Sequence, residues 1–388
     1  MKKFIIPIML GLFAFKGTAQ GGADPSLGNR VITTAVPFLL IAGDARSAGM
    51  GDIGVATSAD AFSQQWNASK YAFAISKNGV GVTYTPYLSQ LVNDIFLGNI
   101  TYYNRIDEKS AFAASFRYFS LGEIELRETA DQTPLIVKPN ELALDVSYSL
   151  RLSERFSMGV TGRFINSDLK IQAADADATS ASSFAVDVSG YYQSEEVAYD
   201  DFDGRWRAGF NVSNIGPKLK YDEVGQENNL PTNLALGGGF DFILDEYNKV
   251  GVTAEVNKLL VPTPQDFDND GDIDAEDDDE YETISFFSGM FQSFGDAPDG
   301  FSEELKEFTW ALGAEYWYQD SFAFRTGYFN ESDLKGSRKF LSLGAGFKYT
   351  SINIDVSYLF STSKIRSPLE GTLRFGLTFN FGDEYDEY

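Results

Sequence analysis

Residues 373–381 read LRFGLTFNF, a run in which a large apolar residue stands at every second position and Arg374, Thr378 and Asn380 lie between. Strict alternation of this kind gives a β-strand one apolar face and one polar face. The same pattern occurs in several earlier stretches: residues 142–150, 184–192, 308–318, 341–349 and 352–358. The chain therefore predicts an all-β fold built from two-faced strands.

About fourteen such segments can be counted along the chain. Their expected starts lie near Gly79, Ile95, Ala111, Leu142, Phe156, Phe184, Trp206, Leu234, Val250, Phe308, Phe322, Phe340, Ile352 and Leu373. An even number of strands of roughly ten residues suits a single-chain barrel of the outer membrane. Beyond the first twenty residues no apolar run is long enough for a membrane-spanning helix. We therefore expect an antiparallel transmembrane β-barrel over residues 79–382.

The connections between the predicted strands support this interpretation. Those after even-numbered strands are mostly short, whereas those after odd-numbered strands are mostly long, and the longest spans residues 258–307. Short periplasmic turns that alternate with long extracellular loops are typical of outer-membrane barrels. Residues 193–205, after the sixth strand, break the pattern because they are long where a short turn is expected.

A soluble β-sandwich would also alternate, so the chemistry of the two faces has to distinguish the two folds. One face carries Phe, Tyr, Trp and Leu, as a lipid-facing band with aromatic girdles would. The other carries charges of both signs in nearly equal number, which suggests ion pairs across a lumen. These charges are Arg117, Asp145, Arg163, Asp187, Glu255, Glu315, Arg325, Asp355 and Arg374.

The two ends of the chain differ from the barrel. Residues 1–19 have a basic start, an apolar run and a small-residue end, which together predict a secretory signal peptide. Residues 20–78 form an N-terminal segment that includes a stretch rich in Gly and Ala, residues 41–74, without a clear period. We expect this stretch to plug the lumen; the alternative is a periplasmic extension. Residues 383–388 form an acidic tail.

Composition weighs against catalysis and against nucleic acid. The chain has no His and no Cys, so the commonest general base and the thiolate nucleophile are both missing. Its formal net charge of -25 repels phosphates. We therefore expect a protein that is not an enzyme, although unusual Ser-Lys chemistry stays open.

The longest loop contains a candidate calcium site. Residues 266–277 read DFDNDGDIDAED, and Gly271 stands at the sixth position, where an EF-hand loop requires a sharp turn. The last position carries Asp in place of Glu. A solvated acidic run is the alternative interpretation. The candidate ligands of a Ca²⁺ ion are Asp266, Asp268, Asp270, Asp272, Asp274 and Asp277.

An apolar cluster follows the acidic loop. Large apolar side chains are costly to expose in an external loop unless something covers them. The cluster is thus either a docking surface for a partner or a part of the loop that folds over its own barrel. It consists of Phe286, Phe287, Met290, Phe291 and Phe294.

Residues 45–69, ARSAGMGDIGVATSADAFSQQWNAS, resemble the N-terminal hatch of the FadL-type outer-membrane transporter superfamily. That hatch has a Gly-Met-Gly turn, an Ala-rich stretch with Asp and then Asn-Pro-Ala. The present chain departs from it at Asn67-Ala68-Ser69, where the Pro is missing. The resemblance implies fourteen strands around an internal plug. The matching plug residues are Arg46, Gly49, Met50, Gly51, Asp60 and Asn67.

Within this superfamily the whole mature chain is most similar to the PorV-type family of the type IX secretion system. The similarity rests on the hatch, on residues 115–128 as a third strand, on the absence of Cys and His, and on the aromatic last strand before an acidic tail. It implies a non-enzymatic shuttle that works in outer-membrane lipid. Its partners would be the type IX translocon, the C-terminal signal domains of cargo proteins and a sortase-like surface peptidase. The alternative function is a FadL-type channel for small hydrophobic molecules.

Overall fold

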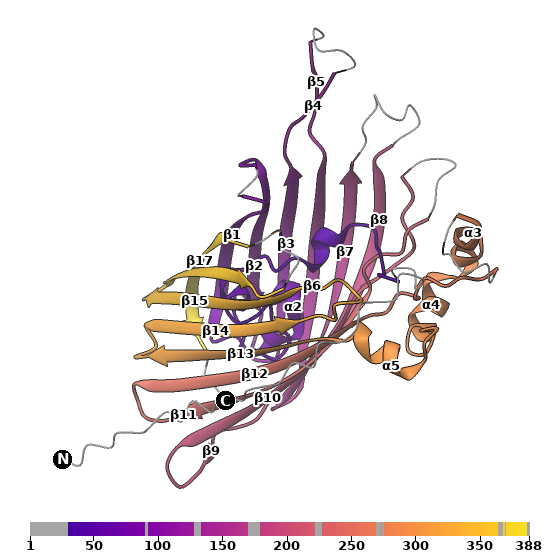
Figure 1. Cartoon of the computed structure of the whole chain (residues 1–388). Coiled ribbons are helices and arrows are strands. Elements are labelled where there is room, and N and C mark those ends of the chain that lie inside the picture. The colour runs from indigo at the N-terminus through magenta and orange to yellow at the C-terminus, as the bar shows by residue number, and fades with distance from the viewer. Residues whose placement is uncertain are drawn as a thin grey trace.

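The structure is a computed structural model of the chain, and Figure 1 shows its arrangement. It describes residues 30–89, 92–127, 133–169, 179–221, 227–268, 273, 275–363, 368 and 370–385. The predicted signal peptide and residues 386–388 of the predicted tail lie outside the described residues. No helix in the described part of the chain is long and apolar enough to cross a membrane.

Fourteen long strands form the barrel wall. Short helices lie before the first wall strand and between the ninth and tenth. The wall strands are β1 (Ser76–Pro86), β2 (Ile95–Arg105), β3 (Ser110–Leu121), β6 (Asn140–Ser153), β7 (Phe156–Asp168), β8 (Ala181–Gln193), β10 (Asp203–Ile215), β11 (Asn233–Ile243), β12 (Asn248–Leu259), β13 (Thr309–Tyr318), β14 (Phe322–Asn330), β15 (Lys339–Tyr349), β16 (Ile352–Ser361) and β17 (Leu373–Glu384). The other elements are η1 (Pro37–Leu40), α1 (Ala45–Ala48), α2 (Ser63–Trp66), η2 (Ala68–Phe73), β4 (Ile124–Leu126), β5 (Leu135–Val137), β9 (Val197–Ala198), α3 (Ala275–Thr283), α4 (Phe286–Gln292), α5 (Phe301–Glu304) and η3 (Leu305–Glu307).

The wall is closed and antiparallel throughout. Each strand pairs with its neighbours in sequence, and β1 pairs with both β2 and β17, which joins the two ends of the sheet. Every strand start predicted from alternation lies within three residues of the observed one. The alternation also marks the faces, since Asp145 in β6 is 1% exposed and its neighbour Val146 is 64% exposed. The predicted fourteen-stranded barrel is confirmed.

One strand end differs from the prediction, and one connection explains the exception to the loop pattern noted above. The third strand was expected to run through residues 115–128, but β3 ends at Leu121, before Gly122 at a φ of 81°. Beyond that turn the chain forms a separate hairpin, β4 and β5. The long connection after the sixth strand contains β9, in which Ala198 pairs with Asp203 of β10. Its extra residues thus extend the hairpin between β8 and β10.

The N-terminal segment runs through the barrel from one end to the other. We call the end with the long connections external. There, Arg30 forms an ion pair with Glu303 of α5 at 2.8 Å. At the opposite end, the carbonyl of Ala74 accepts a hydrogen bond of 2.6 Å from Arg105 of β2, just before β1 begins. The segment therefore lies inside the lumen, as the plug hypothesis requires and a periplasmic extension would not.

Candidate functional site

The plug is joined to the wall by a charged network around Arg46. Asp44 caps α1 by accepting a hydrogen bond of 2.8 Å from the Ser47 backbone nitrogen. This positions Arg46, whose guanidinium donates to both carboxylate oxygens of Glu315 in β13, at 3.0 and 2.8 Å. It also donates to Asp60 of the plug at 2.8 Å. Bidentate pairs of this kind are strong and fix orientation.

Among the described residues, the ion pairs of the wall join charges on nearby strands and do not reach across the lumen. Arg163 in β7 donates to Asp145 in β6 at 2.6 Å and to Asp187 in β8 at 2.9 Å. Arg325 in β14 likewise bridges Glu315, at 2.5 Å, and Asp355 in β16, at 2.6 Å. The expectation of ion pairs across the lumen is wrong in this respect. Because the plug occupies the barrel axis, each charge finds its partner on a nearby strand or on the plug itself.

A second polar anchor holds the middle of the plug. Glu255 of β12 accepts hydrogen bonds of 2.9 Å from the backbone nitrogens of both Gly54 and Val55. On the other side of the same bend, the Lys70 ammonium donates to the Gly54 carbonyl at 2.8 Å and to Thr57 at 3.0 Å. Sequence reasoning placed Glu255 on the wall but missed Lys70. Lys70 is the single lysine of residues 41–74, and this was the available signal.

Glycines on both sides let the plug backbone approach the wall backbone closely. Gly51 has a φ of 87°, and a Cβ built there would lie 3.1 Å from the backbone of Tyr328. A Cβ on Gly327 of β14 would lie 1.9 Å from the Met50 carbonyl carbon, and one on Gly49 would lie 3.0 Å from Gly344. A side chain at Gly327 would overlap the plug backbone, and one at Gly49 or Gly51 would force its neighbours to shift, so the predicted Gly-Met-Gly turn lies flat against the wall.

Asn67 ties together the plug and another part of the wall. Its side chain is fully buried and donates to the carbonyls of Val55, at 2.9 Å, and of Gly190 in β8, at 3.0 Å. Its oxygen accepts from the Ser69 backbone nitrogen at 3.1 Å. The Asn that the chain shares with the hatch motif, just before the missing Pro, therefore has a structural role. Each predicted plug residue lies within the lumen or against its wall.

The external end of the lumen is apolar, which sequence reasoning did not predict. Phe38 and Leu39 of η1 pack there against inward-facing Leu97, Phe119 and Ile165 of the wall. The Phe38 and Phe119 rings stack with centroids 6.1 Å apart. Residues that could accept a hydrophobic ligand are thus covered by the chain itself.

Below the plug the lumen keeps a cavity of about 300 Å³. Arg46, Asp60 and Glu315 line its inner end, and Lys348 and Asn380 line it near the periplasmic turns. Its inner end is the same charged network that holds α1. The cavity is therefore a vestibule that ends at the plug.

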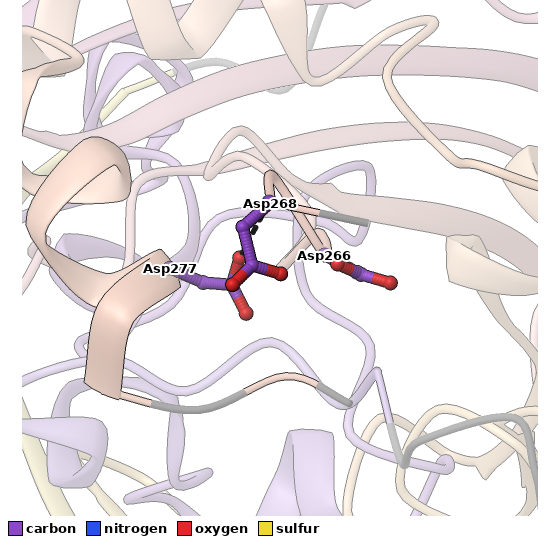
Figure 2. Close-up of side chains that lie close together, drawn as sticks. All are labelled: Asp266, Asp268 and Asp277. Carbon is purple, nitrogen blue, oxygen red and sulfur yellow. Dashed lines mark hydrogen bonds between the residues drawn. The ribbon is translucent and has the colours of Figure 1, made fainter. Parts of the chain in front are cut away.

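Three of the predicted calcium ligands lie together in the long loop. The carboxylate oxygens of Asp266, Asp268 and Asp277 lie within 4.8 Å of one another. Figure 2 shows Asp277, on α3, beside Asp268, with Asp266 to one side. Asp277 is only 2% exposed and accepts a hydrogen bond of 2.6 Å from the Phe267 backbone nitrogen. The predicted ligands Asp270, Asp272 and Asp274 lie outside the described residues.

The residues of the predicted apolar cluster, most of which lie on α4, differ in burial. Met290 is 8% exposed and packs inward, and Phe286 is half-buried. In contrast, Phe287, Phe291 and Phe294 are 60%, 66% and 49% exposed. The loop therefore folds onto its own barrel and also leaves aromatic rings outside.

An ion-pair cluster fastens this loop to the barrel. Lys258 of β12 contacts Glu304, at 2.6 Å, and Glu307, at 2.7 Å. Lys335, from the loop between β14 and β15, contacts Glu303 and Glu307 at 2.8 and 2.9 Å. Although burial acts to raise it, these hydrogen bonds hold the pKa of Glu307 below its usual range. The cluster is well paired, so its carboxylates need no metal ion.

Comparisons with solved structures identify the fold. The CymD monoaromatic hydrocarbon channel is similar with a TM-score of 0.50 at 12% identity, and the match covers 90% of this chain and 99% of that one. The Pseudomonas putida toluene transporter TodX gives a TM-score of 0.48 at 10% identity, covering 88% and 96%. A Pseudomonas aeruginosa FadL homologue gives 0.45 at 13%, covering 88% and 98%. The fold is that of a FadL-like outer-membrane barrel.

Sequence comparison gives a family. The model described as "Type IX secretion system protein PorV" matches residues 24–266, which include the plug and the first nine wall strands. No curated protein sequence matches the chain.

Proposed function

Because this chain belongs to the PorV family of type IX secretion system proteins, we propose that it acts as an outer-membrane shuttle without catalytic activity. It binds the C-terminal signal domains of cargo proteins at the translocon and passes them to a sortase-like surface peptidase. The observation that carries this proposal, beyond the family, is the filled lumen. A barrel whose interior is occupied by its own chain has its external loops left for binding partners.

The alternative, a channel for small hydrophobic molecules, has less support. An apolar ligand that entered from outside would have to displace Phe38 and Leu39 from their contacts with the wall. It would then meet the ion pairs of Arg46 and Glu315, where an apolar molecule gains nothing for breaking charge-assisted hydrogen bonds. The charged plug is thus a poor path for such a substrate.

The two functions predict different results for the isolated protein. We expect the tagged full-length chain, extracted from its native membrane, to retain translocon components and secreted proteins that carry a C-terminal signal domain. We also expect vesicles that contain the purified protein to take up toluene-like molecules no faster than empty vesicles. Uptake above that background, together with a purified protein free of secreted partners, would favour the channel.

We further propose that the loop binds Ca²⁺ through Asp266, Asp268 and Asp277. Two observations support this: the EF-hand spacing, with these residues at positions 1, 3 and 12, and the convergence of the three carboxylates in the folded loop. The proposal takes this loop to lie on the external side, where a calcium site of modest affinity would be filled.

The calcium proposal can be tested by Tb³⁺ luminescence and by calorimetric Ca²⁺ titration of the purified protein. We expect Asp277→Asn to weaken Ca²⁺ binding about tenfold or more, because position 12 supplies the bidentate ligand of such loops. Asp279→Asn is the matched control, since this side chain is exposed on the same helix and lies outside the three-carboxylate group. Equal affinities for the two variants would contradict the proposed ligand set.

A further inference from the structure

A lysine on the outer face of the barrel is buried by the long loop. Lys258 is an even number of residues from Val252 and Val256, so its side chain belongs to the same outer face of β12. Val252 and Val256 are 43% and 40% exposed, yet Lys258 is 1% exposed. Glu304 and Glu307 cover its ammonium, and the ring centroids of Phe294 and Phe308 lie 6.0 and 5.2 Å from it. The loop therefore packs on the outside of the wall, and Figure 1 shows α3, α4 and α5 gathered beside the barrel.

The helix α4 presents three distinct sides. Successive residues of a helix are separated by about 100°, so residues four apart share a side. Gly289 and Met290 are buried, and the Gly289 backbone lies against Pro262 and Ile284 of the same loop. Phe287 and Phe291 lie on one free flank, with ring centroids 5.3 Å apart. On the other free flank, Gln292 donates a hydrogen bond of 3.1 Å to Ser288. One free flank is thus aromatic and the other polar.

The short helix α5 and the start of η3 also hold large apolar side chains away from the barrel. Glu303 and Glu304 of α5 point toward the barrel and are 6% and 5% exposed, whereas Phe301 and Leu305 are 76% and 54% exposed. This reverses the usual arrangement, in which carboxylates face water and aromatic rings face the core. The ion pairs of the two glutamates with Lys335 and Lys258 hold the helix in this orientation. The apolar residues are therefore held outward by buried charge.

These outward side chains adjoin the lipid-facing band of the wall. Asn257 pairs with Thr309, so the covered pair of Lys258 and Phe308 lies at the upper end of the outer face of β12 and β13. Below it on β13 follow the outward-facing Trp310 and Leu312, which are 39% and 51% exposed. Phe294, whose ring centroid lies 6.0 Å from Lys258, thus brings the aromatic side of the loop to the outer face of the wall, which faces acyl chains in an outer-membrane barrel.

We propose that α4 and α5 form a collar on the outer wall that inserts aromatic side chains into the external leaflet of the membrane. A helix with one aromatic and one polar flank suits the boundary between headgroups and acyl chains, where such helices lie in the plane of the membrane. Phe and Leu on the apolar face of such helices bury into the boundary between headgroups and acyl chains. The inserted residues are Phe287, Phe291, Phe294, Phe301 and Leu305.

The chain has no cysteine, so single cysteines can report on the collar. We would label Phe291→Cys with the environment-sensitive dye NBD and reconstitute the purified protein in phosphatidylcholine vesicles, with and without lipids that carry a nitroxide near the headgroup end of the acyl chain. The matched control is Gln292→Cys, the neighbouring exposed residue on the polar flank. Leu305→Cys and Ser302→Cys form a second pair on α5 and η3. Retained heat-modifiable migration in gels would show that each variant is folded.

We expect the dye at positions 291 and 305 to emit at shorter wavelength and to be quenched at least twofold more by the nitroxide lipids than at positions 292 and 302. Equal quenching within both pairs overturns the proposal. So does an aromatic flank that stays exposed in vesicles and becomes shielded only when native-membrane proteins are added, because the collar would then be a protein-docking surface. Since the purified protein is tested without secretion partners, the result does not depend on the proposed shuttle function.

Discussion

Removal of the N-terminal segment is expected to turn a protein that is electrically silent in planar bilayers into an open pore. The segment traverses the lumen from Arg30 at the external mouth to Ala74 at the periplasmic end, so it has to be removed as a whole. A variant in which residues 1–19 are fused directly to residue 75 keeps every wall strand. Fourteen strands enclose more space than their own side chains fill, which leaves a water-filled path lined by charges.

Single-channel recording measures this effect, and the full-length chain, prepared in parallel, is the control. We expect the full-length chain to show no steps and the shortened chain to show steps of uniform size. A point variant, Arg46→Ala, should lie between them with rare, brief openings, because it removes the contacts with Glu315 and Asp60 but leaves those of Glu255 and Asn67. A shortened chain that folds and stays silent would show that the wall collapses or that the loops close the mouth.

Asp145→Ala is expected to be the most destabilising single substitution in the wall. Asp145 is 1% exposed and neutralises two buried guanidiniums, with Arg163 at 2.6 Å and Arg117 at 3.6 Å. Arg163 keeps Asp187, but among the described residues Asp145 is the one carboxylate in ion-pair contact with Arg117. An uncompensated buried charge costs about 3–5 kcal/mol when its partner is removed.

The loss can be measured from the urea dependence of heat-modifiable migration of the protein in lipid vesicles. Glu195→Ala is the matched control, because Glu195 pairs with Arg155 at the exposed end of the barrel, and we expect no measurable change from it. The double variant Asp145→Ala with Arg117→Met should recover much of the loss, since the orphaned charge is gone. A double variant no more stable than Asp145→Ala alone would place the cost elsewhere, in the packing of the Asp145 side chain.

The strands could be predicted because the alternation of apolar and polar residues is visible within each single segment. In a closed barrel every strand has lipid on one side and the lumen on the other, so alternation repeats in each and strand starts such as Ile95, Phe156 and Leu373 follow directly. The end of β3 at Leu121 did not follow, since alternation continues through Glu125 and only the turn at Gly122 stops the strand.

The sequence predicted that charged residues line the lumen, but it did not predict how these charges pair. The sequence indicated that charges such as Arg163, Asp187 and Glu315 face inward, but their partners are set by strand register and by the plug, which are not local properties. The apolar external end was missed because Leu97 and Phe119 stand at inward positions that resemble strand termini in the sequence. The buried Lys70 was missed because its partners are backbone atoms of a bend.

By itself the sequence determined that this chain forms a barrel of about fourteen strands with an internal plug, because alternation and the hatch motif are patterns within single segments. Only the tertiary structure decided that the N-terminal segment traverses the whole lumen and that the long loop lies on the outer wall. Both depend on contacts between residues far apart in the chain: Arg30 with Glu303, Arg46 with Glu315, and Lys258 with Glu307. Ion pairs between such distant positions form only once the strands are closed into a ring that brings their ends together.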